Sequence, residues 1–289
     1  MTVLELLNRS TSTLKNHQIE NPRLNAELLL AHSLNLDREG LYRHLPSQPK
    51  EREKEVLEKL IQRRISGEPL QYLLARQEFW SIDLKVDPRV FIPRPETELL
   101  VEQGLLILSE ISFKRTPSIL EIGTGSGAIV IALARERKPL FLVATDISRE
   151  ALGLAQENAK LVGVQDQINF VNGDLFGPFC FSKENKLFDL ILSNPPYLIR
   201  PEIGSLAKEV KEHEPIIALD GGEDGLECYR HLISQAPFYL REGGWLLLEI
   251  GEGQGSRVFE LIEEEGSFSK PDCILDLSGI ERVVKAQKK

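Results

Sequence analysis

The sequence predicts an α/β protein: a mainly parallel, seven-stranded sheet, preceded by a small helical domain and joined to it by a β-hairpin. Two patterns support this. From residue 118 onward, short apolar runs alternate with amphipathic stretches of helical length, which is the order that gives parallel strands covered on both faces. Before residue 79 no strand-like alternation occurs, and apolar residues recur at helical spacing.

The first 78 residues are expected to form a helical domain. An apolar series runs from Val3 to Leu14, and Pro22 stands where a first helical turn tolerates proline. A charged stretch over residues 50–65 carries its apolar side chains on one face. The predicted division is therefore a helical domain over 1–78, a hairpin linker over 79–95 and a sheet domain over 96–289.

The linker and the sheet domain follow from local patterns. Apolar residues on both sides of a turn at Asp87-Pro88-Arg89 suggest a hairpin over 79–92, and a helix is expected from Pro93 to about Ser109. The polar stretch 200–222 is expected to be a loop or lid. The predicted strands are 119–121, 141–146, 168–173, 188–193, 244–250, 273–277 and 282–286, and the later helices are 127–136, 149–162, 225–240 and 254–265.

Net charge and cysteine spacing argue against nucleic-acid binding and metal binding. The net charge of -9 argues against a broad nucleic-acid-binding face, and no direct nucleic-acid partner is expected. Residues 1–78 contain 12 basic and 11 acidic residues, so only this near-neutral part is suited to an anionic partner. The three cysteines show no metal-ligand spacing and are expected to be small core residues in a reducing compartment, so no metal is expected: they are Cys180, Cys228 and Cys273.

No apolar run approaches the roughly 18–20 residues that span a membrane, and the amino terminus lacks a secretion signal. The protein is expected to be cytoplasmic and to act as a monomer.

A glycine-rich loop follows the first strand of the sheet domain, in the sequence Glu121-Ile-Gly-Thr-Gly-Ser-Gly127. Glycines there let the backbone turn tightly and approach a ligand, while the next helix presents free N–H groups. The loop also satisfies a looser dinucleotide fingerprint, so by itself it does not identify the cofactor. The expected ligand contacts in this loop are Gly123, Thr124, Gly125, Ser126 and Gly127.

Two acidic residues end the next two strands. Asp146 could accept the hydroxyls of a ribose, or it could instead serve as a cap at the start of the following helix. Asp174 could receive the amino group of an adenine, with Leu175 against the ring, or it could be a turn residue.

The most informative stretch is Asn194-Pro195-Pro196-Tyr197, which follows the buried strand Phe188–Ser193. Two prolines hold the backbone extended and remove two N–H donors. The Asn194 side-chain oxygen and nearby carbonyls are then available as acceptors, and Tyr197 adds a flat apolar face. Such a site suits a planar group that carries N–H donors. A stiff surface turn is the alternative.

Ligands of such sheets bind at the carboxyl ends of the parallel strands. The loops that follow the first four predicted strands are therefore expected to border one crevice.

These motifs together resemble the HemK/PrmC family of class I methyltransferases. The acidic residue ahead of three spaced glycines is similar to the loop that binds S-adenosylmethionine. The Asn-Pro-Pro-Tyr sequence resembles that of enzymes that methylate amide or exocyclic nitrogen. The resemblance extends over the whole chain in four further segments: Arg63–Leu73, Phe91–Glu98, Leu219–Leu226 and Gly279–Val284.

The resemblance implies a Rossmann-like methyltransferase domain whose reaction converts S-adenosyl-L-methionine to S-adenosyl-L-homocysteine. The implied partners are class 1 peptide chain release factors, methylated at the glutamine N5 of their Gly-Gly-Gln motif, with the helical domain docking them. Gly123–Gly127 would hold the methionine part, Asp146 the ribose, and Phe91 with residues 93–98 the pocket wall. Leu175 stands where many relatives place an aromatic residue. The implied substrate and catalytic residues are Asn194, Pro195, Pro196 and Tyr197.

Three other functions fit parts of the pattern. A nucleic-acid amine methyltransferase would also use Asn-Pro-Pro-Tyr, although the acidic charge opposes it. A non-catalytic binding module and a nicotinamide dehydrogenase are further alternatives. The segment His213-Glu214-Pro215 could supply a base near the predicted lid or serve structurally, and Arg94 could pair with a carboxylate.

Overall fold

The computed structural model describes residues 1–111, 115–179 and 188–289. Cys180 therefore lies outside the described residues. The chain divides into two compact units: Met1–Arg76 with Ala207–His213, and Gln77–Leu206 with Glu214–Lys289. A segment from the middle of the chain thus belongs to the first unit. The stretch 200–222, which was predicted to be one loop or lid, is divided between the two units.

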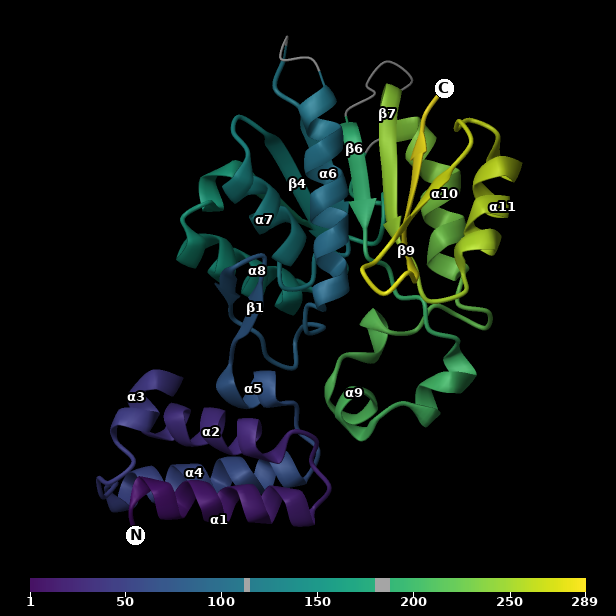
Figure 1. The fold of residues 1–289 in the computed structure, drawn as a ribbon. Helices are drawn as coiled ribbons and strands as arrows, with labels where there is room; N and C mark the ends of the chain where they lie inside the picture. The colour runs from purple at the N-terminus through teal and green to yellow at the C-terminus, as the bar shows by residue number, and fades with distance from the viewer. Residues whose placement is uncertain (112–114, 180–187) are drawn as a thin grey trace. The chain divides into compact units, whose positions relative to one another are not determined.

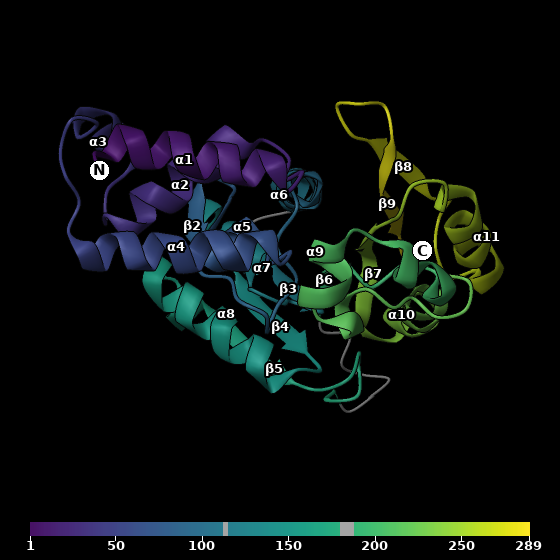
Figure 2. The same cartoon turned by 90° about the horizontal axis from the view of Figure 1, so that it is seen from below.

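The first unit consists of helices, as its sequence predicts. They are α1 (Val3–Asn16), α2 (Pro22–Ser33), α3 (Arg38–Arg43), α4 (Glu51–Ile65), α5 (Leu70–Leu74) and α9 (Lys208–His213). Helices α1, α2 and α4 pack side by side (Figures 1 and 2). Thr2 and Glu5 form a capping box that satisfies free N–H groups at the start of α1. The core of the unit is formed by buried apolar side chains of these helices, among them the fully buried Leu7, Leu14 and Leu29.

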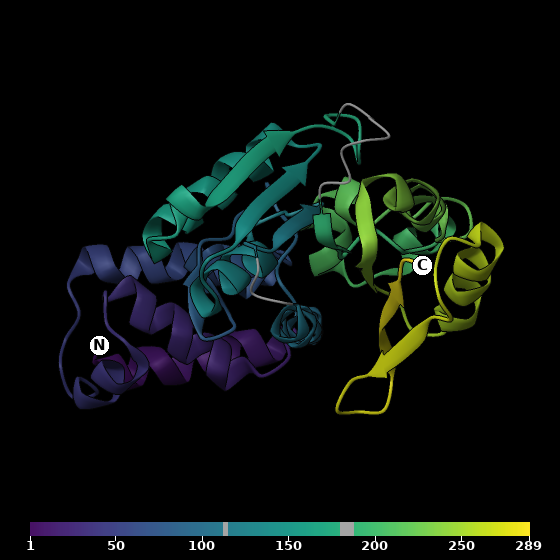
Figure 3. The ribbon, with the colours of Figure 1, turned by 90° about the horizontal axis from the view of Figure 1, so that it is seen from above.

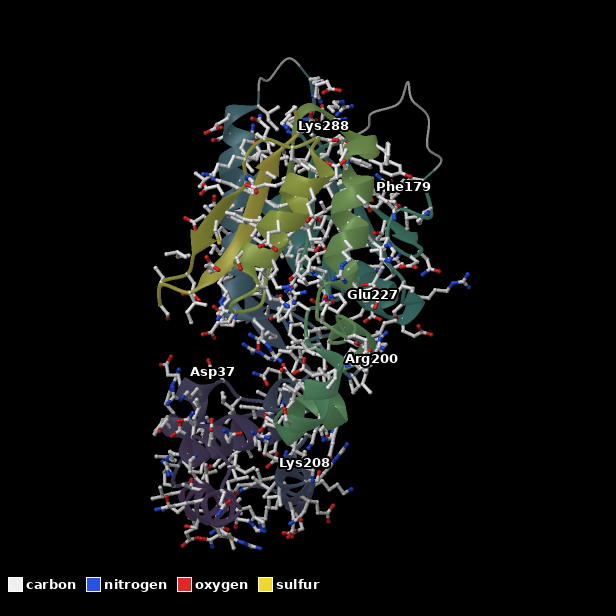
Figure 4. All side chains as sticks on the ribbon, turned by 90° about the vertical axis from the view of Figure 1, so that its right-hand side faces the viewer. Asp37, Phe179, Arg200, Lys208, Glu227 and Lys288 are labelled. Carbon is white, nitrogen blue, oxygen red and sulfur yellow. The ribbon has the colours of Figure 1, made fainter. Side chains whose placement is uncertain are left out.

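A buried arginine joins α9 to this unit. The side chain of Arg64 in α4 is buried, and its guanidinium donates to Asn25 Oδ1 at 2.8 Å and to Glu209 Oε1 at 2.6 Å. Lys208, labelled in Figure 4, begins α9. Since a buried guanidinium needs compensating acceptors, Glu209 contributes directly to the stability of the first unit.

The second unit contains the predicted seven-stranded sheet. Its strands are β3 (Ser118–Ile122), β4 (Phe141–Asp146), β5 (Ile168–Asn172), β6 (Phe188–Ser193), β7 (Leu240–Glu249), β8 (Asp272–Leu275) and β9 (Glu281–Gln287). The strand order is β5-β4-β3-β6-β7-β9-β8. The pairs from β5 to β7 are parallel, and β9 runs antiparallel to both β7 and β8. The fold class predicted from the sequence is confirmed.

Helices cover both faces of this sheet. They are α6 (Glu98–Glu110), α7 (Ala128–Glu136), α8 (Arg149–Val162), α10 (Glu227–Tyr239) and α11 (Gly255–Glu265). One buried cluster joins α6, α7 and α8 to one face, and another joins α10 and α11 to the opposite face. Figure 3 shows α6 and α10 on opposite sides of the strands. The strands β3 and β6 are buried at every position, because they lie in the middle of the sheet.

The described part of the second unit also contains short 3₁₀ helices: η1 (Pro95–Thr97), η2 (Gln165–Gln167), η3 (Arg200–Ser205) and η4 (Ile216–Ala218). Within the described ranges, no helix combines the length and apolar character that crossing a membrane would need.

The hairpin prediction is correct in kind but wrong in position. The hairpin consists of β1 (Gln77–Phe79) and β2 (Ile82–Leu84), and its turn is Trp80-Ser81. Both turn residues have positive φ, 52° and 53°, as a two-residue hairpin turn of type I′ requires. Asp87-Pro88-Arg89 does not join two strands. The Asp87 carboxylate there accepts from the Arg89 N–H and guanidinium, and this closes a local turn instead.

Candidate active site

The predicted site residues lie at one edge of the sheet. Ile122 of β3 is in register with Thr145 of β4 and with Ser193 of β6. Asp146 pairs with Asn172 of β5. The loops after β3, β4, β5 and β6 therefore begin at the same level, at the carboxyl ends of parallel strands. This is the edge at which doubly wound sheets bind their ligands.

The glycine loop after β3 is held by hydrogen bonds to a buried carboxylate. Glu121 is 1 % exposed, and its Oε2 accepts from the Thr124 hydroxyl at 2.7 Å and from the Val130 N–H at 3.2 Å. Burial raises the pKa of Glu121 to about 8, even though both hydrogen bonds favour its charged form. Glu121 thus ties the loop to the first turn of α7.

The glycines of this loop have two different roles. Gly123 and Gly125 have φ of 74° and 55°, and a Cβ on either would meet nothing within 4 Å. Both glycines therefore adopt a backbone conformation that L-residues rarely adopt. The space beside them is open. A Cβ on Gly127, in contrast, would lie 2.9 Å from Ile131 Cδ1 and 3.1 Å from Ala155 Cβ. Gly127 therefore permits close packing of α7 on α8.

Asp146 holds the loops after β3 and β4 together. Its Oδ2 accepts from the Gly125 N–H at 2.8 Å, and its Oδ1 accepts from the Ser148 N–H at 2.9 Å. Burial raises its pKa. The cap of α8 is Ser148, whose hydroxyl accepts from the Ala151 N–H. Each carboxylate oxygen can accept more than one bond, so Asp146 keeps acceptor capacity for further donors.

The residues predicted for the adenine end follow β5. Asp174 is exposed, and its backbone oxygen accepts from the Gly177 N–H at 2.8 Å, so it also forms a turn. Leu175 is partly buried and adopts a positive φ of 47°. The backbone N–H of Gly173 donates to the backbone oxygen of Asp146 at 3.0 Å, and this bond keeps the turn beside the loop after β4.

The Asn-Pro-Pro-Tyr segment follows β6 directly beside the glycine loop. Ser193 is buried, and its hydroxyl donates to the backbone oxygen of Ile122 at 2.7 Å. Pro195 is buried, whereas Asn194, Pro196 and Tyr197 are partly buried. Asn194 Nδ2 donates to the Thr97 hydroxyl oxygen at 3.2 Å. The segment is thus joined both to the end of β3 and to the residues that precede α6.

The chain after Tyr197 is supported by the Leu219–Leu226 segment. Leu198 pairs with Asp220 in a short parallel bridge, with N–H···O distances of 3.0 and 2.9 Å. Arg200, labelled in Figure 4, forms ion pairs with Asp220 at 2.8 Å and Glu223 at 3.0 Å. A Cβ on Gly221 would lie 2.8 Å from the Tyr197 backbone, so only glycine permits this approach.

A cavity of about 270 Å³ opens beside Tyr197 and is lined by Arg94, Glu96, Tyr197, Glu249 and Arg282. Burial raises the pKa of the Tyr197 phenol. Arg94 stacks over the Phe91 ring at 4.4 Å and forms an ion pair with Glu214, which also accepts from the Ile92 N–H at 3.1 Å. Of the two interpretations of Glu214, these contacts favour the structural one.

Two buried residues at this edge, Asn158 and Glu249, were not predicted from the sequence. Asn158 of α8 bonds to the backbone of Lys85 and Ser126. Glu249 lies against Asn194, as does Thr97, which belongs to the predicted pocket wall 93–98. Glu249 ends β7, so its position at the end of a predicted strand could have revealed it. Asn158 lies inside a helix and gives no such signal. The described residues hold no cluster of three His, Cys, Asp or Glu side chains suited to a metal ion.

Known proteins share both the sequence and the fold. Residues 5–74 match the PrmC N-terminal domain family, and residues 100–210 match the methyltransferase small domain family. A release factor glutamine methyltransferase of Geobacter sulfurreducens is 40% identical over 98% of this chain and 95% of its own length. That of Moorella thermoacetica is 37% identical over 100% of this chain and 99% of its own.

The chain belongs to the release factor glutamine methyltransferase family.

The fold of this family member agrees with that of solved methyltransferases. A human methyltransferase 10 domain containing protein superposes with a TM-score of 0.53, at 15% identity, over 72% of this chain and 88% of the other. At that identity the likeness shows the fold alone. The family therefore follows from sequence, whereas the structure shows that the predicted site residues share one edge of the sheet.

Proposed function

We propose that this protein transfers a methyl group from S-adenosyl-L-methionine to the glutamine N5 of the Gly-Gly-Gln motif in class 1 peptide chain release factors, in the cytoplasm and as a monomer. One observation carries the proposal. Asn194-Pro195-Pro196-Tyr197 follows the strand that pairs directly with β3, and the Ser193 hydroxyl bonds to the end of β3. An acceptor site for a planar amide thus borders a glycine loop suited to a sulfonium cofactor.

The residues at the edge fit S-adenosylmethionine. When bound, the cofactor supplies a methyl group on a positively charged sulfur. Gly123 and Gly125 leave open space for its methionine part, beside Thr124, Ser126 and Gly127. Asp146 retains acceptor capacity for the ribose. The remaining proposed contacts are Asp174 for the adenine amine, Leu175 for the ring, and Phe91 and Asn194 for the pocket wall.

The nucleophile is an amide nitrogen, whose lone pair is delocalised into its carbonyl. In this proposal the Asn194 Oδ1 and the Pro195 carbonyl accept the two N–H bonds of that nitrogen, and Tyr197 packs against the amide plane. Pro196 keeps the backbone extended. Held acceptors fix the direction of the nitrogen and draw electron density to it, so positioning supplies most of the rate gain. The excess proton then leaves to water.

The helical unit is the proposed docking surface for the release factor. Relatives that match over the full length are named release factor glutamine methyltransferases, and residues 5–74 carry the family's own amino-terminal domain. The exposed basic residues Arg52 and Lys59 on α4 offer a test. Reversing their charge should raise KM for the whole release factor and leave methylation of a short Gly-Gly-Gln peptide unchanged. Unchanged KM for the whole factor would argue against docking on α4.

The decisive experiment is intact-mass analysis, with peptide mapping, of a release factor incubated with this protein and S-adenosylmethionine. One added methyl group is expected on the glutamine, and none on a factor with alanine at that position. Asn194→Ala should lower turnover by at least ~100-fold, whereas cofactor affinity should change little. Asn169→Ala, at an exposed position of β5, is the control. Methylation of DNA or RNA instead would favour the nucleic-acid alternative.

A further inference from the structure

Three side chains from separate segments meet behind the Asn-Pro-Pro-Tyr segment. Asn194 follows β6, Thr97 ends η1 just before α6, and Glu249 ends β7. The neighbouring strands bring two of them together, because Ser193 of β6 is in register with Leu248 of β7. Thr97 and Glu249 are both buried, at 4 % and 3 % exposure. Neither residue has a part in the proposed chemistry.

The hydrogen bonds among these groups determine which way the Asn194 carboxamide points. Its Nδ2 donates to the Thr97 hydroxyl oxygen at 3.2 Å. The Asn194 and Thr97 side chains also face the Glu249 carboxyl group and oppose the rise of its pKa on burial, as groups that donate to a carboxylate do. An ionised carboxylate only accepts, so the group of Asn194 that faces it must be Nδ2. Both N–H bonds of Asn194 are then used, and its Oδ1 is left for another donor.

Glu249 is a costly group to bury at this position. No hydrogen-bond donor for its Oε2 is found among the described residues, and a buried polar atom without a hydrogen bond is destabilising. Burial raises its pKa to about 7, opposed by the donors Thr97 and Asn194 and by Arg282. The charged groups that line the adjoining cavity are Arg94, Glu96 and Arg282. A leucine could fill this position without the desolvation free energy of a carboxylate. Packing alone therefore does not explain a glutamate here.

We propose that Glu249, together with Thr97, is a positioning residue that holds the Asn194 carboxamide with its Oδ1 facing the methyl-accepting amide. This rests on the proposed function, because it assumes that Asn194 Oδ1 receives an N–H bond of the substrate. In the opposite orientation Asn194 would present two donors to the substrate amide nitrogen. One of the two N–H bonds of that nitrogen would then lack an acceptor, and only the bond to the Pro195 carbonyl would remain.

The arrangement depends on the protonation of Glu249. Above pH 7 the carboxylate accepts from Asn194 Nδ2 and enforces the productive orientation. Below pH 7 the protonated acid can donate to Asn194 Oδ1 and so compete with the substrate. Turnover is therefore expected to rise with pH through an inflection near 7. Arg282 favours the carboxylate and Glu96 opposes it, so these two charges shift the midpoint of the inflection.

The test uses the full chain and four variants. Glu249→Gln keeps the shape but adds an N–H₂ group that can face Asn194 Oδ1, and Thr97→Val removes the hydroxyl. Thr97→Ser restores the hydroxyl, and Glu252→Gln changes an exposed carboxylate in the adjoining loop. Glu249→Gln and Thr97→Val should lose at least ~10-fold in kcat, because small misplacements of positioned groups are costly. Thr97→Ser and Glu252→Gln should keep it, and S-adenosylmethionine affinity should fall much less than kcat in Glu249→Gln and Thr97→Val.

Two readouts separate this role from general stability. The pH inflection of kcat near 7 should be present in wild type and in Glu252→Gln, and absent in Glu249→Gln. The NMR signals of the Asn194 side-chain N–H₂ group should titrate near pH 7 in wild type and not in Glu249→Gln. A Glu249→Gln enzyme with wild-type kcat and pH profile would overturn the proposal. The NMR titration needs no substrate, so it tests the geometry even if wild type fails to methylate release factor, whereas that failure would count against the proposed function.

Discussion

The Asn158 carboxamide pairs with the backbone of Lys85 in both directions. Its Oδ1 accepts from the Lys85 N–H at 2.8 Å, and its Nδ2 donates to the Lys85 oxygen at 3.0 Å. The same Nδ2 donates to the Ser126 oxygen at 2.9 Å in the glycine loop. One fully buried side chain of α8 therefore joins the residues after the hairpin to the proposed cofactor loop.

Asn158→Ala should be strongly destabilising, because it removes three hydrogen bonds and leaves buried backbone groups unsatisfied. The expected loss in free energy of unfolding is about 2–4 kcal/mol, measured by urea denaturation. Affinity for S-adenosylmethionine should also fall, since Ser126 lies in the proposed cofactor loop. Gln156→Ala, at an exposed position of the same helix, is the control. A stable variant with unchanged affinity would show that the loop holds its shape without Asn158.

Two glycine-to-alanine substitutions should have opposite effects. A Cβ on Gly221 would lie 2.8 Å from the Tyr197 backbone, whereas a Cβ on Gly153 in α8 would meet nothing within 4 Å. Gly221→Ala should displace Tyr197 and lower turnover at least ~10-fold. Gly153→Ala should raise the free energy of unfolding by about 0.5–1 kcal/mol through helix propensity and leave turnover unchanged. Equal turnover in the two variants would contradict the proposed role of Tyr197.

Glu121 should make stability decrease with rising pH. Its pKa is about 8 in the folded protein and about 4.5 ordinarily. Between these values the folded state binds more protons than the unfolded state, so the free energy of unfolding falls as pH rises. The stabilisation is fully present below pH 4.5 and is lost as pH rises through 8. Glu249, with a pKa near 7, acts in the same direction.

Glu121→Gln keeps an acceptor for the Thr124 hydroxyl and the Val130 N–H but cannot ionise. Urea denaturation between pH 5 and 8.5 should therefore show a smaller decrease in stability than in wild type, by an amount on the order of 1 kcal/mol or more. Glu102→Gln, at an exposed position of α6, should leave the wild-type dependence intact. An identical pH dependence in both variants would show that Glu121 stays ionised when buried.

The Arg94–Glu214 pair should contribute more than an exposed ion pair. Glu214 is 5 % exposed and also accepts from the Ile92 N–H. A double-mutant cycle with Arg94→Ala and Glu214→Ala should give a coupling energy of about 1–3 kcal/mol. The Glu39–Arg43 pair on α3 is the comparison, since both partners are exposed and i,i+4 pairs contribute only about 0.3–0.5 kcal/mol. A coupling energy no larger than that of the exposed pair would mean that Arg94 acts mainly through its stacking on Phe91.

Much of the site could be predicted because strand order and polarity place loop residues. Gly123, Asp146, Asp174 and Asn194 each follow an apolar run, and parallel strands carry such residues to a common edge. Local patterns therefore predicted which residues lie at that edge. The hairpin turn was misplaced because Asp87-Pro88-Arg89 also satisfies a local turn that joins no strands.

The sequence by itself determined the alternation of strands and helices, the seven-stranded sheet, and the motifs at its carboxyl edge. These follow from hydrophobic periodicity and backbone preferences, which act over a few residues. Only the tertiary structure brought Glu249 and Thr97 to Asn194, joined Asn158 to Lys85, and packed α9 into the helical unit through Arg64 and Glu209. The sequence separation is 97 residues between Thr97 and Asn194, 73 between Lys85 and Asn158, and 145 between Arg64 and Glu209. Buried polar groups form hydrogen bonds with the groups that the fold places beside them. Core packing between distant segments determines which groups these are.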